Sequence, residues 1–250
     1  MLSQNKIKYL TSLHSKKFRE KYNTFLAEGD KICLEIVKTQ NIKIEEIFAV
    51  ASWIEKNAAV LAPFRDRLIE ISEAELKKIS CLTTPNQVLI SAKQPDFFID
   101  KSLINNDLSL YLDGIQDPGN MGTILRNADW FGIENVFCSN TCVDIYNPKV
   151  IQASMGAFLR IKSQEIDLEQ LIEETEDLPV YGALLEGNNI FQEKLSKKGI
   201  ILIGSEGKGI SDALLPFITH KIKIPAHGEG AESLNAAVAS GIICAAFRNL

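Results

Sequence analysis

From residue 108 onward, this chain alternates short apolar segments with segments that have helical periodicity. The apolar segments, such as residues 200–203, are unbroken runs, which is typical of strands buried on both faces. The alternation therefore predicts an α/β fold with a parallel sheet covered by helices. Ligands of such sheets bind at the carboxyl ends of the strands, so polar residues at those ends are the first candidates for a functional site.

The expected elements follow from this alternation. We expect strands at residues 109–113, 135–139, 157–161, 180–184, 200–204 and 221–224. We expect helices at residues 122–131, 148–154, 168–174, 211–217 and 233–248.

The first part of the chain has a second, smaller α/β pattern. Strands are expected at residues 24–29, 44–50, 67–71 and 88–92, and helices at residues 17–22, 30–39 and 73–79. Ser72 and Glu75 have the spacing of a capping box for the last helix. Residues 96–107 combine Pro, Asp and Asn without clear periodicity, which predicts a linker. The domains expected are therefore 1–95, a small α/β domain, and 108–250.

Composition excludes several classes of protein. No apolar run approaches the ~18–20 residues that span a bilayer, and the N-terminus lacks a signal-peptide stretch. Five cysteines without a Cys-x-x-Cys pair argue against a disulfide framework. Cys138 and Cys142 could meet a metal, but no histidine lies beside them, so buried thiols are the simpler interpretation. We therefore expect a cytoplasmic protein with no membrane partner and no metal.

Charge is distributed unevenly along the chain. The net charge of −5 is not typical of a nucleic-acid-binding protein. Cations nevertheless gather near the N-terminus around the single acid Glu20. They are Lys6, Lys8, Lys16, Lys17, Arg19 and Lys21. Two interpretations stay open for this cluster: a solvated helix face, or a surface that contacts RNA.

Three polar, glycine-containing clusters follow expected strands. In the first, Arg126 is expected one turn into a helix on the face of Gly122, near a helix N-terminus that already favours anions. A cation there suggests a phosphate or substrate oxygen as its partner.

The second cluster, residues 204–209, is not a P-loop, because Leu202 stands where the first glycine is required and Gly209 follows the lysine.

The third cluster runs from residue 224 to residue 237. Ser233 or a neighbouring polar side chain could cap the last helix. Taken in order, the clusters 120–126, 204–209 and 232–237 resemble the three signature motifs of the SpoU-type (TrmH-like) RNA ribose 2'-O-methyltransferases of the SPOUT class. The first ninety or so residues resemble the small RNA-binding, substrate-binding domain that is often fused ahead of this methyltransferase domain, and the tract at residues 13–29 carries that likeness.

The resemblance implies a fold, a cofactor and a site. It implies a C-terminal trefoil knot and a homodimer whose active site is completed across the interface. S-adenosylmethionine would be held by the backbone around Gly204, Ile224 and Leu234. The reaction centre would be lined by Asn120, Arg126, Glu206, Ser233 and Asn235. Lys16, Lys17 and Arg19 are expected to hold the RNA backbone.

The implied activity is methylation of a ribose 2'-hydroxyl of RNA. Ribosomal RNA is favoured over transfer RNA because of the additional N-terminal domain. A guanidinium rarely gives up its proton, so Arg126 is expected to stabilise a developing alkoxide or hold a phosphate. The alternative is a non-catalytic RNA-binding or ribosome-assembly factor. It is suggested by the acidic composition and by residues 226–231, where the family commonly has a bulky apolar residue after Ile224-Pro225.

Overall fold

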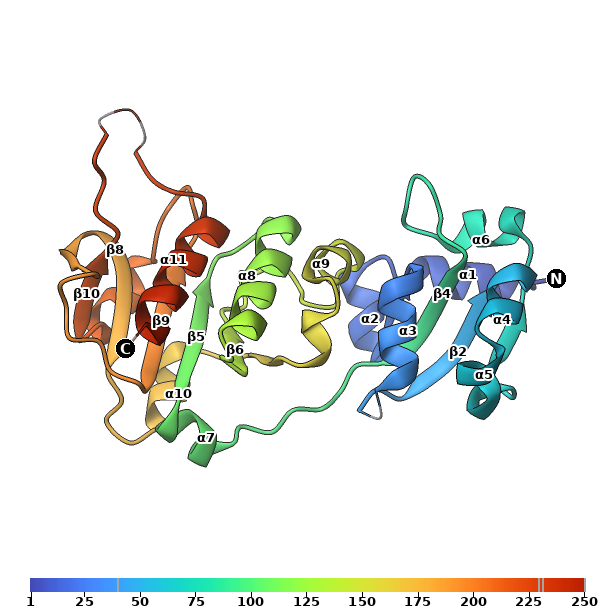
Figure 1. Ribbon diagram of the computed structural model, residues 1–250, viewed down its shortest axis with the longest axis horizontal. Coiled ribbons are helices and arrows are strands. Elements are labelled where there is room, and N and C mark those ends of the chain that lie inside the picture. Colours follow the sequence, from blue (N-terminus) through green and yellow to red (C-terminus); the bar gives the residue numbers. More distant parts are fainter. Residues whose placement is uncertain (40, 229, 231, 250) are drawn as a thin grey trace. The chain divides into compact units, whose positions relative to one another are not determined.

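The computed structural model describes residues 1–39, 41–228, 230 and 232–249. The chain forms two compact units (Figure 1). Unit 1 comprises residues 1–96 and 144–159, and unit 2 comprises residues 97–143 and 160–250. Across the described residues, every helix is too short or too polar to cross a membrane.

Unit 1 contains a four-stranded sheet in the order β1-β4-β2-β3. Its strands are β1 (Thr24–Glu28), β2 (Ile44–Ala49), β3 (Leu68–Glu70) and β4 (Val88–Lys93). Its helices are α1 (Gln4–Ser12), α2 (Lys16–Tyr22), α3 (Asp30–Lys38), α4 (Ala51–Lys56), α5 (Ala58–Leu61), η1 (Ala62–Phe64), α6 (Glu73–Ile79), α9 (Pro148–Ser154) and η2 (Ala157–Leu159). The predicted capping box opens α6: Ser72 Oγ accepts the Glu75 N–H, and the Glu75 carboxylate accepts the Ser72 N–H.

Residues 144–159, which follow the second strand of the C-terminal sheet, pack within unit 1. The ring of Phe25 lies 5.1 Å from that of Tyr146 and 5.8 Å from that of Phe158, centroid to centroid. The strand expected at residues 157–161 is wrong. Met155, with φ +51°, caps α9, and Gly156 follows it with φ +91°. The apolar residues after this reversal are buried as the single turn η2 rather than in a sheet.

Unit 2 contains a six-stranded sheet in the order β10-β8-β9-β5-β6-β7, and all its strand pairs are parallel. Its strands are β5 (Leu108–Asp113), β6 (Asn135–Cys138), β7 (Lys162–Glu165), β8 (Val180–Asn189), β9 (Gly199–Gly204) and β10 (His220–Lys223). Its helices are α7 (Lys101–Asn106), α8 (Pro118–Trp130), α10 (Leu168–Glu173), η3 (Asp212–Phe217) and α11 (Ala236–Arg248). The predicted α/β fold with a parallel sheet is confirmed, and the knot stays a prediction.

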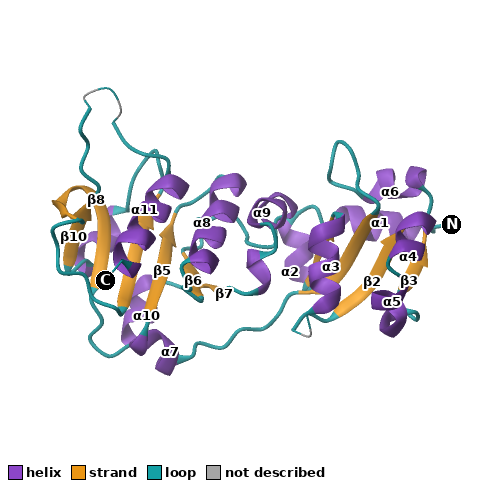
Figure 2. Ribbon diagram, viewed as in Figure 1, coloured by secondary structure: helices purple, strands orange, loops and turns teal. Residues whose placement is uncertain are grey.

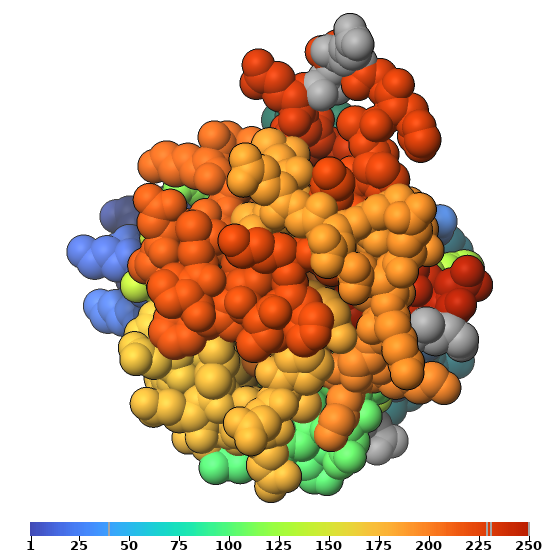
Figure 3. Space-filling view, turned by 90° about the vertical axis from the view of Figure 1, so that its left-hand side faces the viewer, coloured from blue at the N-terminus to red at the C-terminus, as the bar shows by residue number. Residues whose placement is uncertain are grey.

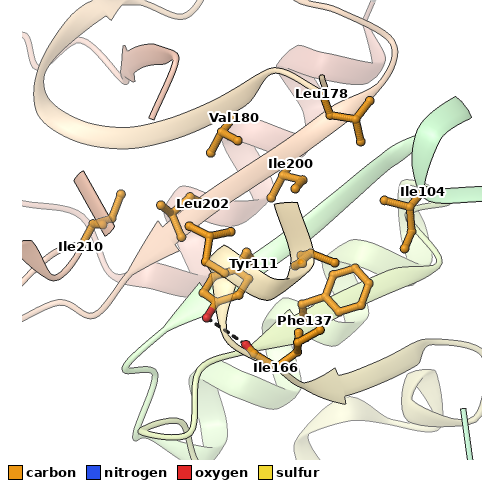
Figure 4. Packing of buried hydrophobic residues seen from close by; sticks show 11 residues of the cluster. Ile104, Tyr111, Phe137, Ile166, Leu178, Val180, Ile200, Leu202 and Ile210 are labelled. Atoms are coloured by element: carbon orange, nitrogen blue, oxygen red, sulfur yellow. Dashed lines mark hydrogen bonds between the residues drawn. The ribbon is translucent and has the colours of Figure 1, made fainter. Parts of the chain in front are cut away.

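One face of this sheet packs against α10. Tyr111, Ile200 and Leu202 belong to a buried cluster that includes Leu168 and Leu171 of that helix (Figure 4). The hydroxyl of Tyr111 donates a hydrogen bond of 3.0 Å to the carbonyl of Ile166, so its one polar atom is satisfied. Because side chains alternate along a strand, the intervening residues of β9 face the opposite side.

On that opposite side, α8 and α11 lie next to each other (Figure 2). Asn127 Nδ2 donates to the carbonyl of Ala237 and to Ser240 Oγ, both at 2.8 Å. At the other end of α8, Arg248 donates to the carbonyls of Phe131 and Gly132 at 2.8 Å each. The bonds of Arg248 satisfy carbonyls that the C-terminal end of α8 leaves without partners, and both sets of bonds join the last helix to the helix of the first motif.

Three boundaries differ from expectation because side chains cap the helices. Asp117 Oδ1 accepts the Asn120 N–H at 2.8 Å, so α8 begins at Pro118 and Arg126 lies about two turns into it rather than one. Asp100 caps α7 inside the expected linker. Asn235, and not Ser233, caps α11, which begins at residue 236. The expected helix at residues 211–217 is the 3-10 helix η3.

Candidate active site

The site lies where the direction of strand addition reverses in the sheet of unit 2. On one side of β5 the sheet continues with β6 and then β7. On the other side of β5 lies β9, which comes later in the chain. The last residues of the two central strands, Asp113 and Gly204, are paired. The loops after β5 and β9 therefore start side by side, at the position where open α/β sheets bind ligands.

The loop after β9 is a tight five-residue turn. Ser205 and Gly209 exchange two backbone hydrogen bonds, of 3.1 and 2.8 Å, and Gly209 has φ +68°. A Cβ atom on Gly204 would lie 2.1 Å from the carbonyl carbon of Gly209, so only glycine fits there. Asp113 Oδ2 accepts the Ser211 N–H at 2.8 Å, which joins the far side of the turn to the end of β5.

Three side chains, one from each predicted motif, form one hydrogen-bond network. Asn120 Nδ2 donates a short hydrogen bond to Glu206 Oε1. Asn235 Nδ2 donates to Asn120 Oδ1 and to Glu206 Oε1, both at 2.9 Å. The three residues are far apart in sequence, so their contact tests the expectation that the motifs meet at the strand ends. The structure brings Asn120, Glu206 and Asn235 together as expected.

The start of α11 adds further donors to this network. Glu206 Oε1 accepts the Ala236 N–H at 3.3 Å, and a helix N-terminus favours a carboxylate at this position. Asn235 Oδ1 accepts the N–H groups of Ala237 at 3.0 Å and Val238 at 3.2 Å. Asn235 therefore both caps the helix and positions the carboxylate.

Two cysteines support the beginning of the first loop. Cys142 Sγ accepts the Ile115 N–H at 3.3 Å, and the Val143 N–H donates to the carbonyl of Ile115 at 2.8 Å. A hydrogen bond from the Cys138 thiol lowers the pKa of Cys142 to about 7. The described side chains form no group of three or more His, Cys, Asp or Glu residues placed to hold a metal, and the Cys142 thiol acts here as an anchor of the loop.

The other expected site residues lie outside this network. Arg126 is exposed and makes no hydrogen bond or ion pair with any residue that the structure describes. Ser233 and Leu234 are exposed in the long segment between β10 and α11, which stands out from the surface of unit 2 (Figure 3). Ile224 follows the last residue of β10 and is half-buried. Of the unusual loop at 226–231, residues 229 and 231 lie outside the described part of the chain.

The sequence analysis did not anticipate the carboxyl end of β8. This strand lies between β9 and β10 in the sheet, so its end lies between the ends that carry Gly204 and Ile224. The pairing of β8 with β10 shifts from Gly182 to Asn188, and Leu185 in the intervening stretch is 73% exposed. Only the strand order places this segment next to the ends of β9 and β10, since nothing local in the sequence distinguishes it.

The predicted RNA contacts in unit 1 divide into two groups. Arg19 is buried, and its guanidinium donates to Asp144 at 2.6 Å and to the carbonyls of Leu13 and His14 at 2.8 and 2.9 Å. The expectation that Arg19 holds RNA is therefore corrected, because its donors are used inside the protein. Lys16 and Lys17 are exposed on α2, with Lys16 3.7 Å from Glu20.

The parallel sheet and the motif network at its reversal point define unit 2 as a methyltransferase domain of the SPOUT class. The chain belongs to the SpoU rRNA methylase family, whose model matches residues 107–245. The model of the MRM3-like substrate binding domain matches residues 4–90. The cofactor of this class of enzyme is S-adenosylmethionine.

Individual relatives agree with this assignment. The chain is 31% identical over 246 residues to a Bacillus subtilis protein named 23S rRNA (guanosine(2553)-2'-O)-methyltransferase RlmP, covering 95% of this chain and 94% of that protein. A TrmH-family protein from Porphyromonas gingivalis has a TM-score of 0.85 at 36% identity, covering 100% and 99% of the two chains. An AdoMet-bound rRNA methyltransferase from Sinorhizobium meliloti has a TM-score of 0.87 at 25% identity, covering 100% and 97%.

Proposed function

We propose that this chain methylates a ribose 2'-hydroxyl of ribosomal RNA with S-adenosylmethionine. The observation that carries the proposal is the network of Asn120, Glu206 and Asn235 at the reversal point of the sheet. The 23S rRNA specificity in the name of the Bacillus subtilis relative, which is similar over nearly the whole chain, supports ribosomal RNA as the substrate.

The residues present fit the cofactor. Gly204 carries no side chain at the end of β9, and Leu185 and Leu234, 73% and 44% exposed, offer apolar surface for a flat adenine ring. We assign the cofactor to the backbone around Gly204, Ile224 and Leu234, with Leu185 as an additional wall. When bound, it supplies an electrophilic methyl group, so the protein has to orient the ribose oxygen and assist loss of its proton.

We assign that assistance to Arg126. Its guanidinium is exposed and uses none of its donors on described residues, so it can stabilise a developing alkoxide or hold the adjacent phosphate. Asn120, Glu206 and Asn235 form the rigid edge against which cofactor and ribose are oriented, and Ser233 is assigned to the ribose side.

In unit 1, we assign RNA backbone contacts to Lys16 and Lys17 on α2. Both are exposed cations at the start of a helix in the substrate-binding domain, and phosphates are the groups that such cations bind. All five cysteines, each in the described part of the chain, are free thiols. Free thiols are usual in a reducing compartment, which supports the cytoplasm as the place of the reaction.

We further infer that the chain forms a homodimer through unit 2. Trp130 of α8 is 85% exposed and Val238 of α11 is 51% exposed, whereas most of the large apolar residues of these two neighbouring helices are buried. Exposed apolar side chains on adjacent helices are typical of an interaction surface. Sedimentation of the protein and of a Val238→Asp variant tests this inference, since the variant should be monomeric.

The decisive experiment maps 2'-O-methyl groups in RNA from cells with and without the protein. We expect one ribosomal RNA position to lose its methyl group. If a transfer RNA position loses its methyl group instead, the substrate is transfer RNA and the reaction is still ribose 2'-O-methylation. If no position is lost and calorimetry detects no binding of S-adenosylmethionine, the chain is the non-catalytic RNA-binding factor that the sequence also allows.

A further inference from the structure

The turn after β9 carries a lysine, Lys208, whose role the network leaves unexplained. Lys208 is exposed at the tip of the turn, two residues beyond Glu206. Gly207 and Gly209 flank it, and apart from their immediate neighbours in the chain no residue lies within 4 Å of the place where a Cβ would stand on either glycine. The tip is therefore open on both sides of the lysine, and an extended polymer can approach it.

The charge of Lys208 is not used inside the protein. The nearest carboxylate in sequence, Glu206, is held through Oε1 by Asn120, Asn235 and the Ala236 N–H. Lys208 makes no hydrogen bond or ion pair with a described residue. Two lysines of unit 2 have carboxylate partners, Lys101 in Glu174 and Lys162 in Glu134, whereas Lys208 shares the lack of one with several exposed lysines, Lys198 among them.

If RNA binds at the network, a cation at this position has a phosphate of the RNA within reach. Each ribose in RNA is joined to a phosphate on either side, so a ribose placed at the network brings two phosphates close to it. A lysine two residues from Glu206 can reach outward on its flexible side chain to one of them. The nucleotide-triphosphate role that a Gly-Lys pair suggests was excluded by the absence of the remaining P-loop residues.

We propose that Lys208 is a positioning residue that binds an RNA phosphate next to the target ribose. The proposal rests on the proposed function, because it takes the ribose site to be the network. The turn then has two roles: Glu206 positions the groups of the network, and Lys208 binds the RNA strand next to the target ribose. The contact is electrostatic and independent of base identity, so it sets the register of the strand and not its sequence.

Lys198 provides a matched control. Its exposed side chain also makes no hydrogen bond or ion pair with a described residue, and it immediately precedes β9, whose carboxyl end leads to Lys208. Because β9 is six residues long, the two lysines lie beyond opposite ends of this strand, roughly 20 Å apart. A change at Lys198 therefore alters net charge equally without altering the site.

The test compares Lys208→Ala, Lys208→Arg and Lys198→Ala in the full chain. The substrate is ribosomal RNA purified from cells that lack the protein, in which the target is unmethylated. For Lys208→Ala we expect KM for RNA to rise about tenfold, the loss typical of one charge-assisted hydrogen bond, with kcat retained. The slope of log binding constant against log salt should become shallower by about 0.7, the value for one single-stranded phosphate. Lys208→Arg should restore most of the affinity, and Lys198→Ala should behave as the unaltered protein.

Several results would overturn this assignment. An unchanged salt slope in Lys208→Ala would show that no phosphate is lost. Weaker binding of S-adenosylmethionine by calorimetry, with an unchanged slope, would assign Lys208 to the cofactor's carboxylate. An equal effect of Lys198→Ala would reduce the role of Lys208 to net charge. If the unaltered protein neither binds nor methylates this RNA, the proposed function fails as well, whereas normal methylation by Lys208→Ala refutes only the role of the lysine.

Discussion

Asn235 donates a hydrogen bond of 2.9 Å to Asn120, although 115 residues separate them in the chain. The same amide caps α11 through its oxygen, whereas Asn120 lies in the first turn of α8. The contact therefore joins the beginnings of two helices that lie next to each other, and Glu206 accepts from both amides. A change in either asparagine should alter the site more than it alters the fold.

Asn235 can be divided into its two roles by two substitutions. Asn235→Ala removes the cap and both donated bonds, so we expect a loss of about 1 kcal/mol of stability and at least a tenfold loss of methyl transfer. Asn235→Asp keeps an oxygen for the cap but places a second carboxylate beside Glu206, so the protein should stay stable and lose activity. Urea denaturation and methyl transfer to RNA measure the two effects. Full activity in Asn235→Asp would mean that the donated bonds are dispensable.

Arg126 should be important for the reaction and neutral for folding. It contacts no described residue through a hydrogen bond or ion pair, so Arg126→Ala should leave the unfolding midpoint unchanged. Methyl transfer should fall by about 10²–10³-fold, as for the loss of one donor to a developing anion. Calorimetry provides the control, because binding of S-adenosylmethionine should persist. Its loss would place the arginine in the cofactor site.

Arg19 and Lys17 should show opposite behaviour. Arg19→Met leaves Asp144, only 14% exposed, without its cation, and we expect a loss of about 3–5 kcal/mol of stability. Lys17→Ala removes an exposed cation, so the free energy of unfolding should change by less than about 0.5 kcal/mol, while the salt dependence of RNA binding becomes shallower. Urea denaturation and binding titrations distinguish them. A stable Arg19→Met protein with weakened RNA binding would restore Arg19 as an RNA contact.

Stability should depend on acid pH through Glu75. Hydrogen bonds from the Ser72 and Leu2 N–H groups and from the Ser72 hydroxyl lower the pKa of Glu75 to about 2 from an ordinary value of 4.5. A pKa that is lowered by folding stabilises the fold above the ordinary value, and this contribution is lost as the pH falls toward the folded value. Glu75→Gln should therefore be less stable than the unaltered protein at neutral pH.

The stability difference between Glu75→Gln and the unaltered protein should shrink as the pH falls from 4.5 to about 2. Denaturation midpoints across this range check the prediction. Glu73→Gln is the matched control, because Glu73 is an exposed acid in the same helical turn. A difference between Glu75→Gln and the unaltered protein that is constant with pH would show that the carboxylate charge is not what the capping box uses.

Local chemistry explains why much of the secondary structure could be predicted. The capping box of Ser72 and Glu75 is contained within four residues, and the unbroken apolar runs of β5 and β9 have the pattern of strands buried on both faces. The predicted starts of helices were less accurate. Asp117 caps α8 and Pro118 is its first residue, so the helix begins closer to the end of β5 than the sequence pattern predicts.

By itself, the sequence determined that three polar clusters end strands of a parallel α/β sheet, and that these clusters carry the residue types of one family of enzymes. The tertiary structure alone decided that β9 lies beside β5, that the end of β8 lies between those of β9 and β10, and that residues 144–159 pack with unit 1. It also decided that Arg19 is buried against Asp144. The physical reason is that strand order and burial depend on contacts between distant segments, whereas propensity, periodicity and capping act within a few residues.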